Sequence, residues 1–281
     1  MKTWLITGVS SGLGRALAQA ALNRGDRVAG TVRNPEAVAR FEALSPERAH
    51  GFIMDVLDPA AVKATVAAVA NTHGAIDILV NNAGYGLVSG VEEASSAEMR
   101  AQFEVNVFGP VTVIQAVLPA MRDRRSGTIV NVTSVSGLVG WPSLGVYSGS
   151  KFALEGITET LAQEVAPFGV SVMMVEPGGF RTDFAGRSRF EAGAPIADYE
   201  GTVLADCKRI LESHTGHERG DPVRAAQAIL SALDAEQPPL RLLLGADAVS
   251  YLRGKLNAQL AETACWETLS ISTDFADAEK A

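Results

Sequence analysis

A tyrosine and a lysine lie four residues apart in the segment from Ser134 to Lys151, which reads SVSGLVGWPSLGVYSGSK. On a helix, Tyr147 and Lys151 fall on one face, one turn apart, so the ammonium lies beside the phenol. A phenol has a pKa near ~10 and is a weak acid or base at neutral pH, but a neighbouring cation favours its ionised form. The pair predicts proton-transfer chemistry, although the same spacing alone also fits an exposed helix face.

Strand-length apolar runs alternate with helix-period segments along almost the whole chain, so we expect one domain, residues 1–281. The pattern predicts an α/β fold: a doubly wound parallel sheet, the Rossmann fold, with helices on both faces. Two segments lack the pattern. Residues 178–200 form a long loop of the kind that covers a substrate, and residues 272–281 form a polar tail. The expected strands are 4–7, 27–32, 51–54, 76–80, 128–132, 170–175 and 241–244; the expected helices are 12–24, 35–44, 58–72, 95–124 with a bend at 109–110, 146–166 and one from 221.

A glycine-rich turn, TGVSSGLG, follows the first expected strand directly and opens the first helix. Glycines here let the backbone approach a pyrophosphate, and the helix start offers unpaired N–H groups and a positive dipole end. The spacing is G-x-x-x-G-x-G rather than G-x-G-x-x-G, and its place between strand and helix makes the signal specific. The expected phosphate-binding residues are Gly8, Ser10, Ser11, Gly12, Leu13 and Gly14.

The end of the second strand predicts which dinucleotide binds. This position reads the ribose 2′ group, with an acid for NAD and a base for the 2′-phosphate of NADP. Here the chain has Thr31, Val32 and Arg33, with no carboxylate to repel a phosphate. We therefore expect NADP(H) to be preferred and NAD(H) to remain possible, with Ser10 or Arg15 adding phosphate contacts.

Composition limits the other functions. The 281 residues carry a formal net charge of −8, which argues against a nucleic-acid or membrane partner. No signal peptide or membrane-spanning run is evident, so we expect a cytoplasmic protein. Cys207 and Cys265 are isolated, and His214 and His217 lack a third ligand, so we expect neither a disulfide nor a metal site.

Taken together, the motifs resemble the short-chain dehydrogenase/reductase family over most of the chain. Seven signatures occur in family order: TGVSSGLG; MDV at 54–56; NNAG at 81–84; Asn106 in EVNVFG; Ser134 in NVTSVSG; YSGSK at 147–151; and Pro177, Gly178 and Thr182 after the sixth strand. The resemblance implies an enzyme, an NAD(P)-dependent oxidoreductase that interconverts a carbonyl compound and an alcohol.

The same resemblance implies roles for individual residues. Tyr147 is expected to act as general acid in reduction and general base in oxidation. Lys151 would lower the tyrosine pKa and bind the nicotinamide ribose, Ser134 would hold the carbonyl oxygen, and Asn106 would position a water that relays protons to Lys151. The implied cofactor contacts are Asp55 and Val56 at the adenine, Asn82, Ala83 and Gly84 beside the ribose, and Pro177, Gly178 and Thr182 at the carboxamide.

Aromatic and apolar residues in two loops favour a mostly apolar small-molecule substrate. They are Tyr85, Leu138, Trp141, Pro142, Phe180, Phe184 and Phe190, and several of them also fit simple packing of the loops. Two alternatives stay open: a non-catalytic NADP(H) sensor or scaffold on the same fold, and an epimerase or dehydratase. The family's helix faces at 96–124 and 146–166 imply a homodimer or homotetramer.

Overall fold

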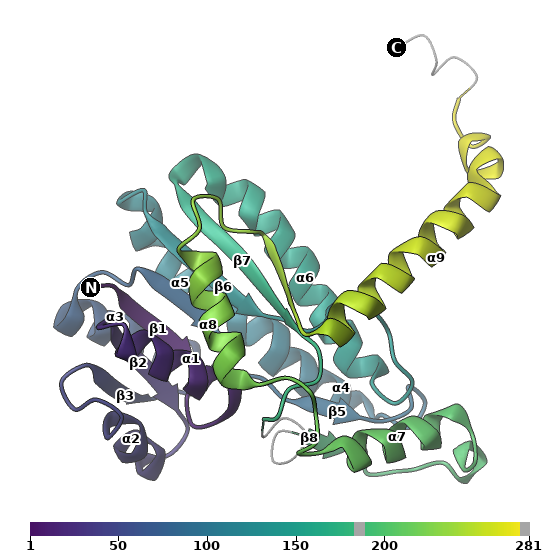
Figure 1. Cartoon of the computed structure of the whole chain (residues 1–281), viewed down its shortest axis with the longest axis horizontal. Helices are drawn as coiled ribbons and strands as arrows, with labels where there is room; N and C mark the ends of the chain where they lie inside the picture. The colour runs from purple at the N-terminus through teal and green to yellow at the C-terminus, as the bar shows by residue number, and fades with distance from the viewer. Residues whose placement is uncertain (183–188, 276–281) are drawn as a thin grey trace.

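Seven parallel strands form the central sheet of the computed structural model, which describes residues 1–182 and 189–275 (Figure 1). The strand order is β3-β2-β1-β4-β6-β7-β9, so the chain starts in the middle and winds outward in both directions. This confirms the doubly wound α/β fold. The strands are β1 Thr3–Thr7, β2 Arg27–Val32, β3 Ala49–Ile53, β4 Ile78–Asn81, β6 Gly127–Val132, β7 Val170–Pro177 and β9 Arg241–Leu244.

Helices cover both faces of the sheet because successive strand residues point to opposite sides. Trp4 and Ile6 of β1 join the core under α1 (Gly12–Asn23), α2 (Pro35–Glu42) and α8 (Pro222–Leu233). Leu5, between them, joins the core under α3 (Pro59–His73), α5 (Gly109–Asp123) and α6 (Gly145–Val165). All three β1 side chains are fully buried, as expected of a strand covered on both faces.

Most predicted helix starts carry the expected caps. Asp58 accepts hydrogen bonds from the N–H groups of Ala60 and Ala61 at the start of α3, and Asp221 caps α8 in the same way. Ser95 and Glu98 form the predicted reciprocal capping box of α4, Ser96–Phe103. Each cap satisfies N–H groups that a helix end otherwise leaves unpaired.

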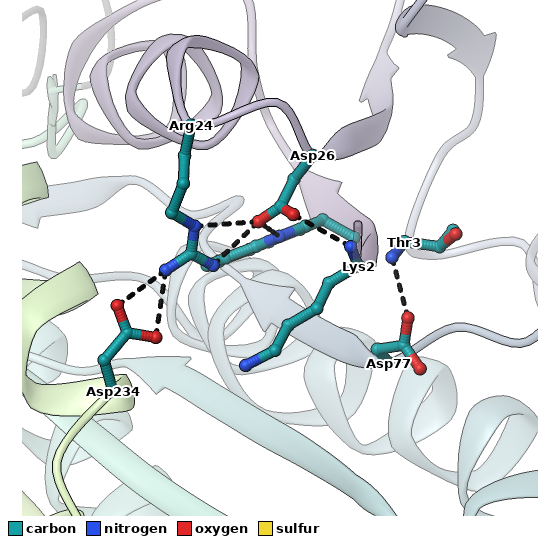
Figure 2. A network of polar contacts seen from close by, with 7 residues as sticks. Lys2, Thr3, Arg24, Asp26, Asp77 and Asp234 are labelled. Carbon is teal, nitrogen blue, oxygen red and sulfur yellow. Dashed lines mark hydrogen bonds and ion pairs between the residues drawn. The ribbon is translucent and has the colours of Figure 1, made fainter.

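An ion-pair network fastens the amino-terminal edge of the sheet (Figure 2). The buried carboxylate of Asp26 accepts hydrogen bonds from the Lys2 backbone at 2.8 Å, the Trp4 indole at 3.0 Å and the Arg24 guanidinium at 2.7 Å. Arg24 also pairs with Asp234 at the end of α8. Figure 2 shows Arg24 between the two carboxylates, joining α1 and β2 to α8.

The structure corrects the expected bend. Between α4 and α5 the helix widens into a π-turn at Glu104–Phe108, one turn earlier than the predicted bend at Gly109 and Pro110. Pro110 is the second residue of α5, which follows the π-turn directly, and the backbone passes through Phe108 and Gly109 in helical conformation. The bend therefore falls on the turn that carries Asn106.

Four elements were not predicted: β5 (Gly86–Val88), β8 (Arg189–Glu191), α7 (Val203–His214) and α9 (Ala246–Ile271). Strands β5 and β8 pair in parallel, so part of the expected loop 178–200 is a small second sheet. Residues 183–188 of that loop, and 276–281 of the expected tail, lie outside the described residues. Helix α9 extends away from the sheet (Figure 1), and Ala248 is the one buried residue in it.

One stretch, Ser96–Asp123, is long and apolar enough to cross a membrane by length and composition alone. Its α5 part places Val113, Val117 and Met121 in the core beneath the sheet, where they are almost completely buried. A core helix of this kind meets the same criterion as a membrane span.

Candidate functional site

The predicted site residues gather at the carboxyl-terminal edge of the sheet. In a doubly wound sheet this is the edge where the strand order reverses and ligands bind. Residues that lie far apart in the chain follow neighbouring strands here (Figure 1): Gly8 follows β1, Arg33 β2, Asp55 β3, Asn82 β4, Ser134 β6 and Gly178 β7.

The glycine-rich turn is packed tightly against the end of β4. Gly8 has φ +74°, a conformation that favours glycine, and a Cβ atom on Gly14 would lie 2.3 Å from Asn82 Nδ2. Asn82 Nδ2 donates to the carbonyl oxygens of Thr7 at 2.9 Å and Gly8 at 3.0 Å. Asn82 therefore holds the turn in place, consistent with a brace between the two strands.

The turn leaves the start of α1 without a side-chain cap. Ser11 occupies the N-cap position but accepts no hydrogen bond there, unlike Asp58 at α3. Thr182, from the other end of the site, lies over the turn, and a Cβ on Gly12 would be 3.3 Å from Thr182 Cβ. The N–H groups at the start of α1 have no side-chain cap, and the glycines let other groups come close to the backbone. Both features suit the binding of a dinucleotide pyrophosphate. Ser10 is exposed on the outer side of the turn.

The ends of β2 and β3 present the residues expected at the adenosine. Arg33 is exposed, whereas the next residue, Asn34, caps α2 by accepting from the Ala37 N–H at 2.9 Å. The Asp55 side chain is exposed and accepts from the Leu57 N–H at 3.0 Å through Oδ1. Asp55 thus shapes its own turn, and Val56 is buried against Gly109.

Ser134, Tyr147 and Lys151 come together as predicted, and all three are buried. The Ser134 and Tyr147 hydroxyls are in hydrogen-bonding contact, and Lys151 Nζ lies 5.9 Å from the centre of the tyrosine ring. Lys151 Nζ also donates to the Val132 carbonyl at 2.9 Å. Burial raises the pKa of Tyr147 to about 12, against the effect of Ser134, and burial lowers the pKa of Lys151 to about 8, against the charge of Glu155.

Asn106 lies in the π-turn next to these groups, and its side-chain amide is hydrogen-bonded to Tyr85 and Ser150. Its Nδ2 donates to the Tyr85 carbonyl at 2.9 Å and to Ser150 Oγ at 3.2 Å, and its Oδ1 accepts from the Tyr85 N–H at 3.2 Å. Ser150 Oγ in turn donates to the Tyr147 carbonyl at 2.7 Å. A Cβ on Gly84 would lie 3.1 Å from Asn106 Oδ1 and 3.8 Å from Lys151 Nζ. The NNAG turn, the π-turn and α6 therefore meet at Asn106.

On the other side of the site, Asp247 at the start of α9 fixes the chain after β7. Asp247 Oδ2 accepts from the Gly179 N–H at 2.8 Å, and a Cβ on Gly178 would lie 2.4 Å from that carboxylate. Pro177 is the last residue of β7, and its carbonyl lies 3.5 Å from Ser134 Oγ. The Pro177–Gly178 segment is thus held beside Ser134.

The loop aromatics divide into two groups. Tyr85 and Phe190 stack edge to face at 5.3 Å, and Trp141 packs against Tyr251 of α9 at 4.6 Å. Phe180 instead packs against the core under α8 and against Gly220, so its expected place in the substrate lining is wrong. Leu138 is half-buried and Pro142 exposed, and Phe184 lies outside the described residues.

Three residues with close contacts here were missed by the sequence reasoning: Ser150, Asp247 and Glu155. Ser150 and Glu155 share the helix of Tyr147 and Lys151, and Glu155 lies one turn beyond Lys151, so helical spacing alone placed it on the same face. Asp247 carried no such signal because its partner Gly179 lies 68 residues away.

Comparison with known proteins identifies the family. Residues 2–192 match the family model described as short chain dehydrogenase. The oxidoreductase BOA17 of Botryotinia fuckeliana is 40% identical over 97% of this chain and 99% of its own length. A 3-ketodihydrosphingosine reductase of Bacteroides thetaiotaomicron is 37% identical over 86% of this chain and 87% of its own length.

The chain belongs to the short-chain dehydrogenase family. It is an NAD(P)-dependent oxidoreductase that acts on CH–OH groups of small-molecule substrates. A short-chain dehydrogenase from Streptomyces avermitilis has the same fold, with a TM-score of 0.91 and 44% identity over 98% of this chain and all of that one.

Solved relatives of this dehydrogenase are known with either dinucleotide. A Burkholderia phymatum enzyme in complex with NAD has a TM-score of 0.79 and 26% identity over 92% of this chain and 95% of its own. An alcohol dehydrogenase from Thermococcus sibiricus complexed with 5-hydroxy-NADP has a TM-score of 0.70 and 25% identity over 87% of this chain and 96% of its own. The cofactor is therefore a nicotinamide dinucleotide.

Proposed function

We propose that this dehydrogenase interconverts a ketone or aldehyde and an alcohol on a mostly apolar small molecule, with Tyr147 as the proton donor and acceptor and with NADP(H) preferred. The observation that carries the proposal is the contact between the Ser134 and Tyr147 hydroxyls in front of the buried Lys151 ammonium. Two hydroxyls side by side give a carbonyl oxygen two hydrogen-bond donors at one point.

The residues of the chain divide the work of the reaction. The bound nicotinamide supplies the hydride in reduction and accepts it in oxidation. Ser134 donates a hydrogen bond to the substrate oxygen and stabilises negative charge that develops on it. Tyr147 gives its hydroxyl proton to that oxygen in reduction and takes it back in oxidation.

Lys151 makes this proton transfer feasible near neutral pH. Burial, partly offset by the hydrogen bond with Ser134, raises the pKa of Tyr147 to about 12, which makes the tyrosinate scarce. A charged ammonium behind the phenol favours the ionised form, and each tenfold gain in tyrosinate corresponds to about 1.4 kcal/mol. Asn106 and Ser150 position the helix turn that carries both groups. A proton relay to Lys151 through a water near Asn106 is part of this proposal and follows from the family resemblance.

Apolar contacts on two sides of the site support the proposed substrate class. The Tyr85–Phe190 pair stands beside the NNAG turn, and the Trp141–Tyr251 pair joins the loop before Tyr147 to α9. One relative is, by its name, a reductase of 3-ketodihydrosphingosine. Aromatic walls of this kind bind an apolar body and leave orientation to the polar centre.

The test of the reaction is Tyr147→Phe, which removes the hydroxyl group that carries the transferable proton. We expect turnover to fall by roughly 10²- to 10⁴-fold while cofactor affinity stays within about twofold, measured by nicotinamide absorbance and by fluorescence titration. Tyr199→Phe is the matched control because its hydroxyl binds Glu92, away from the site, and it should leave turnover unchanged. Near-normal reduction by Tyr147→Phe would refute the assignment.

The NADP(H) preference rests on Arg33 and on the absence of a carboxylate at the end of β2. Arg33 is exposed at the end of β2, where a cationic side chain suits a 2′-phosphate. Arg33→Ser should lower kcat/KM for NADPH by roughly 10- to 100-fold, as expected for one charge-assisted contact, and change kcat/KM for NADH little. Arg40→Ser, on the same helix region, is the control. Equal kcat/KM for NADPH and NADH in the unaltered enzyme would contradict the preference.

We further propose that the enzyme is a cytoplasmic homodimer or homotetramer. Exposed apolar side chains on α6, Phe152 and Ile157, support this assembly, and a shallow hollow of about 520 Å³ runs between α5 and α6 beside Ile157. Light scattering that returned the mass of one chain across micromolar concentrations would contradict it.

A further inference from the structure

A cluster of buried charges lies directly behind Lys151 and has no part in the reaction described so far. Glu155 follows Lys151 by one helical turn in α6, and Glu176 lies in β7. Glu155 is only 4% exposed and Glu176 is 0% exposed. Two carboxyl groups buried together are costly unless they are paired, so their position beside a functional lysine calls for an explanation.

One cation holds the two acids. Arg241 of β9 bonds to Glu155, donates to Glu176 Oε1 at 3.0 Å, and donates to Glu159 Oε2 at 2.8 Å. Glu159 is half exposed, so it is the outer member of the cluster. Arg241 brings one positive charge to three acids, so even with one acid protonated a second cation is needed, and Lys151 is the next cation on the same face of α6.

The two buried acids also share a hydrogen bond. Glu155 Oε1 and Glu176 Oε2 each lack a partner apart from the other carboxyl group, and a proton between them satisfies both oxygens. Burial and the charge of Glu155 raise the pKa of Glu176 to about 7. Burial also raises the pKa of Glu155, against the Thr133 hydroxyl and Arg241. Arg241 acts on both acids, whereas the Thr133 hydroxyl acts on Glu155 alone, so we assign the charge of the pair to Glu155.

We propose that Glu155 is a positioning residue for the reaction: its carboxylate, held ionised by Arg241 and by the proton on Glu176, is the counter-ion that keeps the buried Lys151 ammonium charged. The groups that face Glu155 are Lys151 and Glu159 on α6, Thr133 after β6, Glu176 on β7 and Arg241 on β9. Among them, Lys151 is the cation that also reaches the tyrosine ring. The importance of this charge for turnover rests on the function proposed above.

The first test measures Lys151 itself, without turnover. The reactivity of its amine toward acetic anhydride is followed against pH in the cofactor-free enzyme by peptide mass spectrometry, because only the neutral amine reacts. Glu155→Gln should move the Lys151 midpoint to lower pH by roughly one pH unit, since an opposite charge about one turn away is lost. Circular dichroism confirms that the variant is folded.

Two matched variants separate charge from packing. Glu159→Gln removes the exposed acid on Arg241, and Glu176→Gln removes the other buried acid but still donates a hydrogen bond to Glu155. Glu159→Gln should leave the Lys151 midpoint unchanged. Glu176→Gln should move it less than Glu155→Gln does, because Glu176, with a pKa of about 7, is ionised at the Lys151 midpoint near 8 but is not the acid beside Lys151 on α6. A folded Glu155→Gln enzyme with an unshifted midpoint, or an equal shift in Glu176→Gln, would overturn the proposal.

A reciprocal measurement covers the case in which Glu155→Gln does not fold. If Glu155 stabilises the Lys151 charge, Lys151 stabilises the carboxylates by the same free energy. Lys151→Met should therefore raise the pH at which the carboxyl pair loses its proton, seen as a protonated-carboxyl infrared band that persists to higher pH. No change in that band would also overturn the proposal.

Kinetics then link the pair to the reaction. In Glu155→Gln, the alkaline limb of the kcat profile should move to lower pH by the same amount as the Lys151 midpoint, with KM for the cofactor nearly unchanged. If Lys151 shifts but the limb does not, the proposed role of Lys151 in turnover fails while the Glu155–Lys151 coupling stands. If neither shifts, the coupling itself is absent.

Discussion

Glu93 fastens the segment that follows β8 to the body of the enzyme. It lies between β5 and α4, and its side chain is 2% exposed. Three donors converge on its carboxylate: Lys208 Nζ of α7 at 2.7 Å, the Gly90 N–H at 2.7 Å and the Ile196 N–H at 3.1 Å. The hydrogen bond from Lys208, followed by those from Gly90 and Ile196, lowers the pKa of Glu93 to about 2 despite burial.

Glu93→Gln should loosen this segment without unfolding the sheet. The amide keeps one acceptor oxygen, but its NH₂ group faces a donor, so one charge-assisted hydrogen bond is lost and one donor is left unpaired. Such a bond contributes about 1.5–3 kcal/mol. Taking about 2 kcal/mol, the population of the opened segment rises roughly 30-fold, and the opening is local because α7 has no buried residue.

Hydrogen exchange measured by mass spectrometry tests this directly. Protection factors in peptides covering 193–214 should fall roughly 30-fold in Glu93→Gln, while those in β1, β4 and β6 stay unchanged. Glu92→Gln is the matched control because Glu92 is exposed and accepts a hydrogen bond from the Tyr199 hydroxyl at 2.7 Å at the surface. Unchanged protection in α7, or an equal loss across the central sheet, would refute the reasoning.

The same carboxylate predicts the pH dependence of the segment. Because the folded pKa of Glu93 is depressed, its contribution is present above its ordinary value near 4.5 and is lost as the pH falls toward about 2. Protection of 193–214 in the unaltered enzyme should therefore weaken across that range before the sheet unfolds. Glu93→Gln should lack this step, since its side chain does not titrate.

Two further predictions concern the frame of the site. Asp26→Asn should lower the free energy of unfolding by about 1–3 kcal/mol in urea denaturation. Asp234→Asn, which alters the exposed partner of Arg24, should lower it by less than about 0.5 kcal/mol. Neither variant should change cofactor affinity, because the network lies at the opposite edge of the sheet from the site. Gly14→Ala should abolish cofactor binding in fluorescence titrations, because its Cβ would lie 2.6 Å from the Gly8 carbonyl, whereas Gly156→Ala, with open space around it, should bind normally. Unaltered stability in the first case, or normal affinity in the second, would contradict the geometry.

The parts of the fold that could be predicted are those with strong local signals. Trp4, Leu5 and Ile6 form a continuous apolar run, which indicates a strand covered on both faces, and the structure buries all three. Asp58 before Pro59 and Ser95 before Glu98 mark helix starts through interactions within one turn. The family motifs then identified Ser134, Tyr147 and Lys151, which the structure brings together.

The missed elements lack such signals for physical reasons. Strands β5 and β8 are each three residues long. They pair Gly86 with Arg189, which lies 103 residues further along the chain, so no local pattern marks them. Helix α9 distributes Leu256, Leu260 and Trp266 without a single buried face, so it has no clear period. The π-turn at Glu104–Phe108 contains neither glycine nor proline, and within it Asn106 is hydrogen-bonded to the backbone of Tyr85, 21 residues earlier in the chain.

Buried acids show most clearly where sequence reasoning stops. Glu93 and Glu155 look like any of the acidic residues of a chain with net charge −8, yet each is buried next to the candidate site. Burying a carboxylate is unfavourable without a cation, and the cations lie 115 and 86 residues away, at Lys208 and Arg241. A motif identifies groups that touch substrate or cofactor, whereas Glu93 holds a segment in place and Glu155 acts on Lys151 through charge. Replacing Tyr147 should therefore remove a reaction step, while replacing Glu155 should change the pH at which that step occurs.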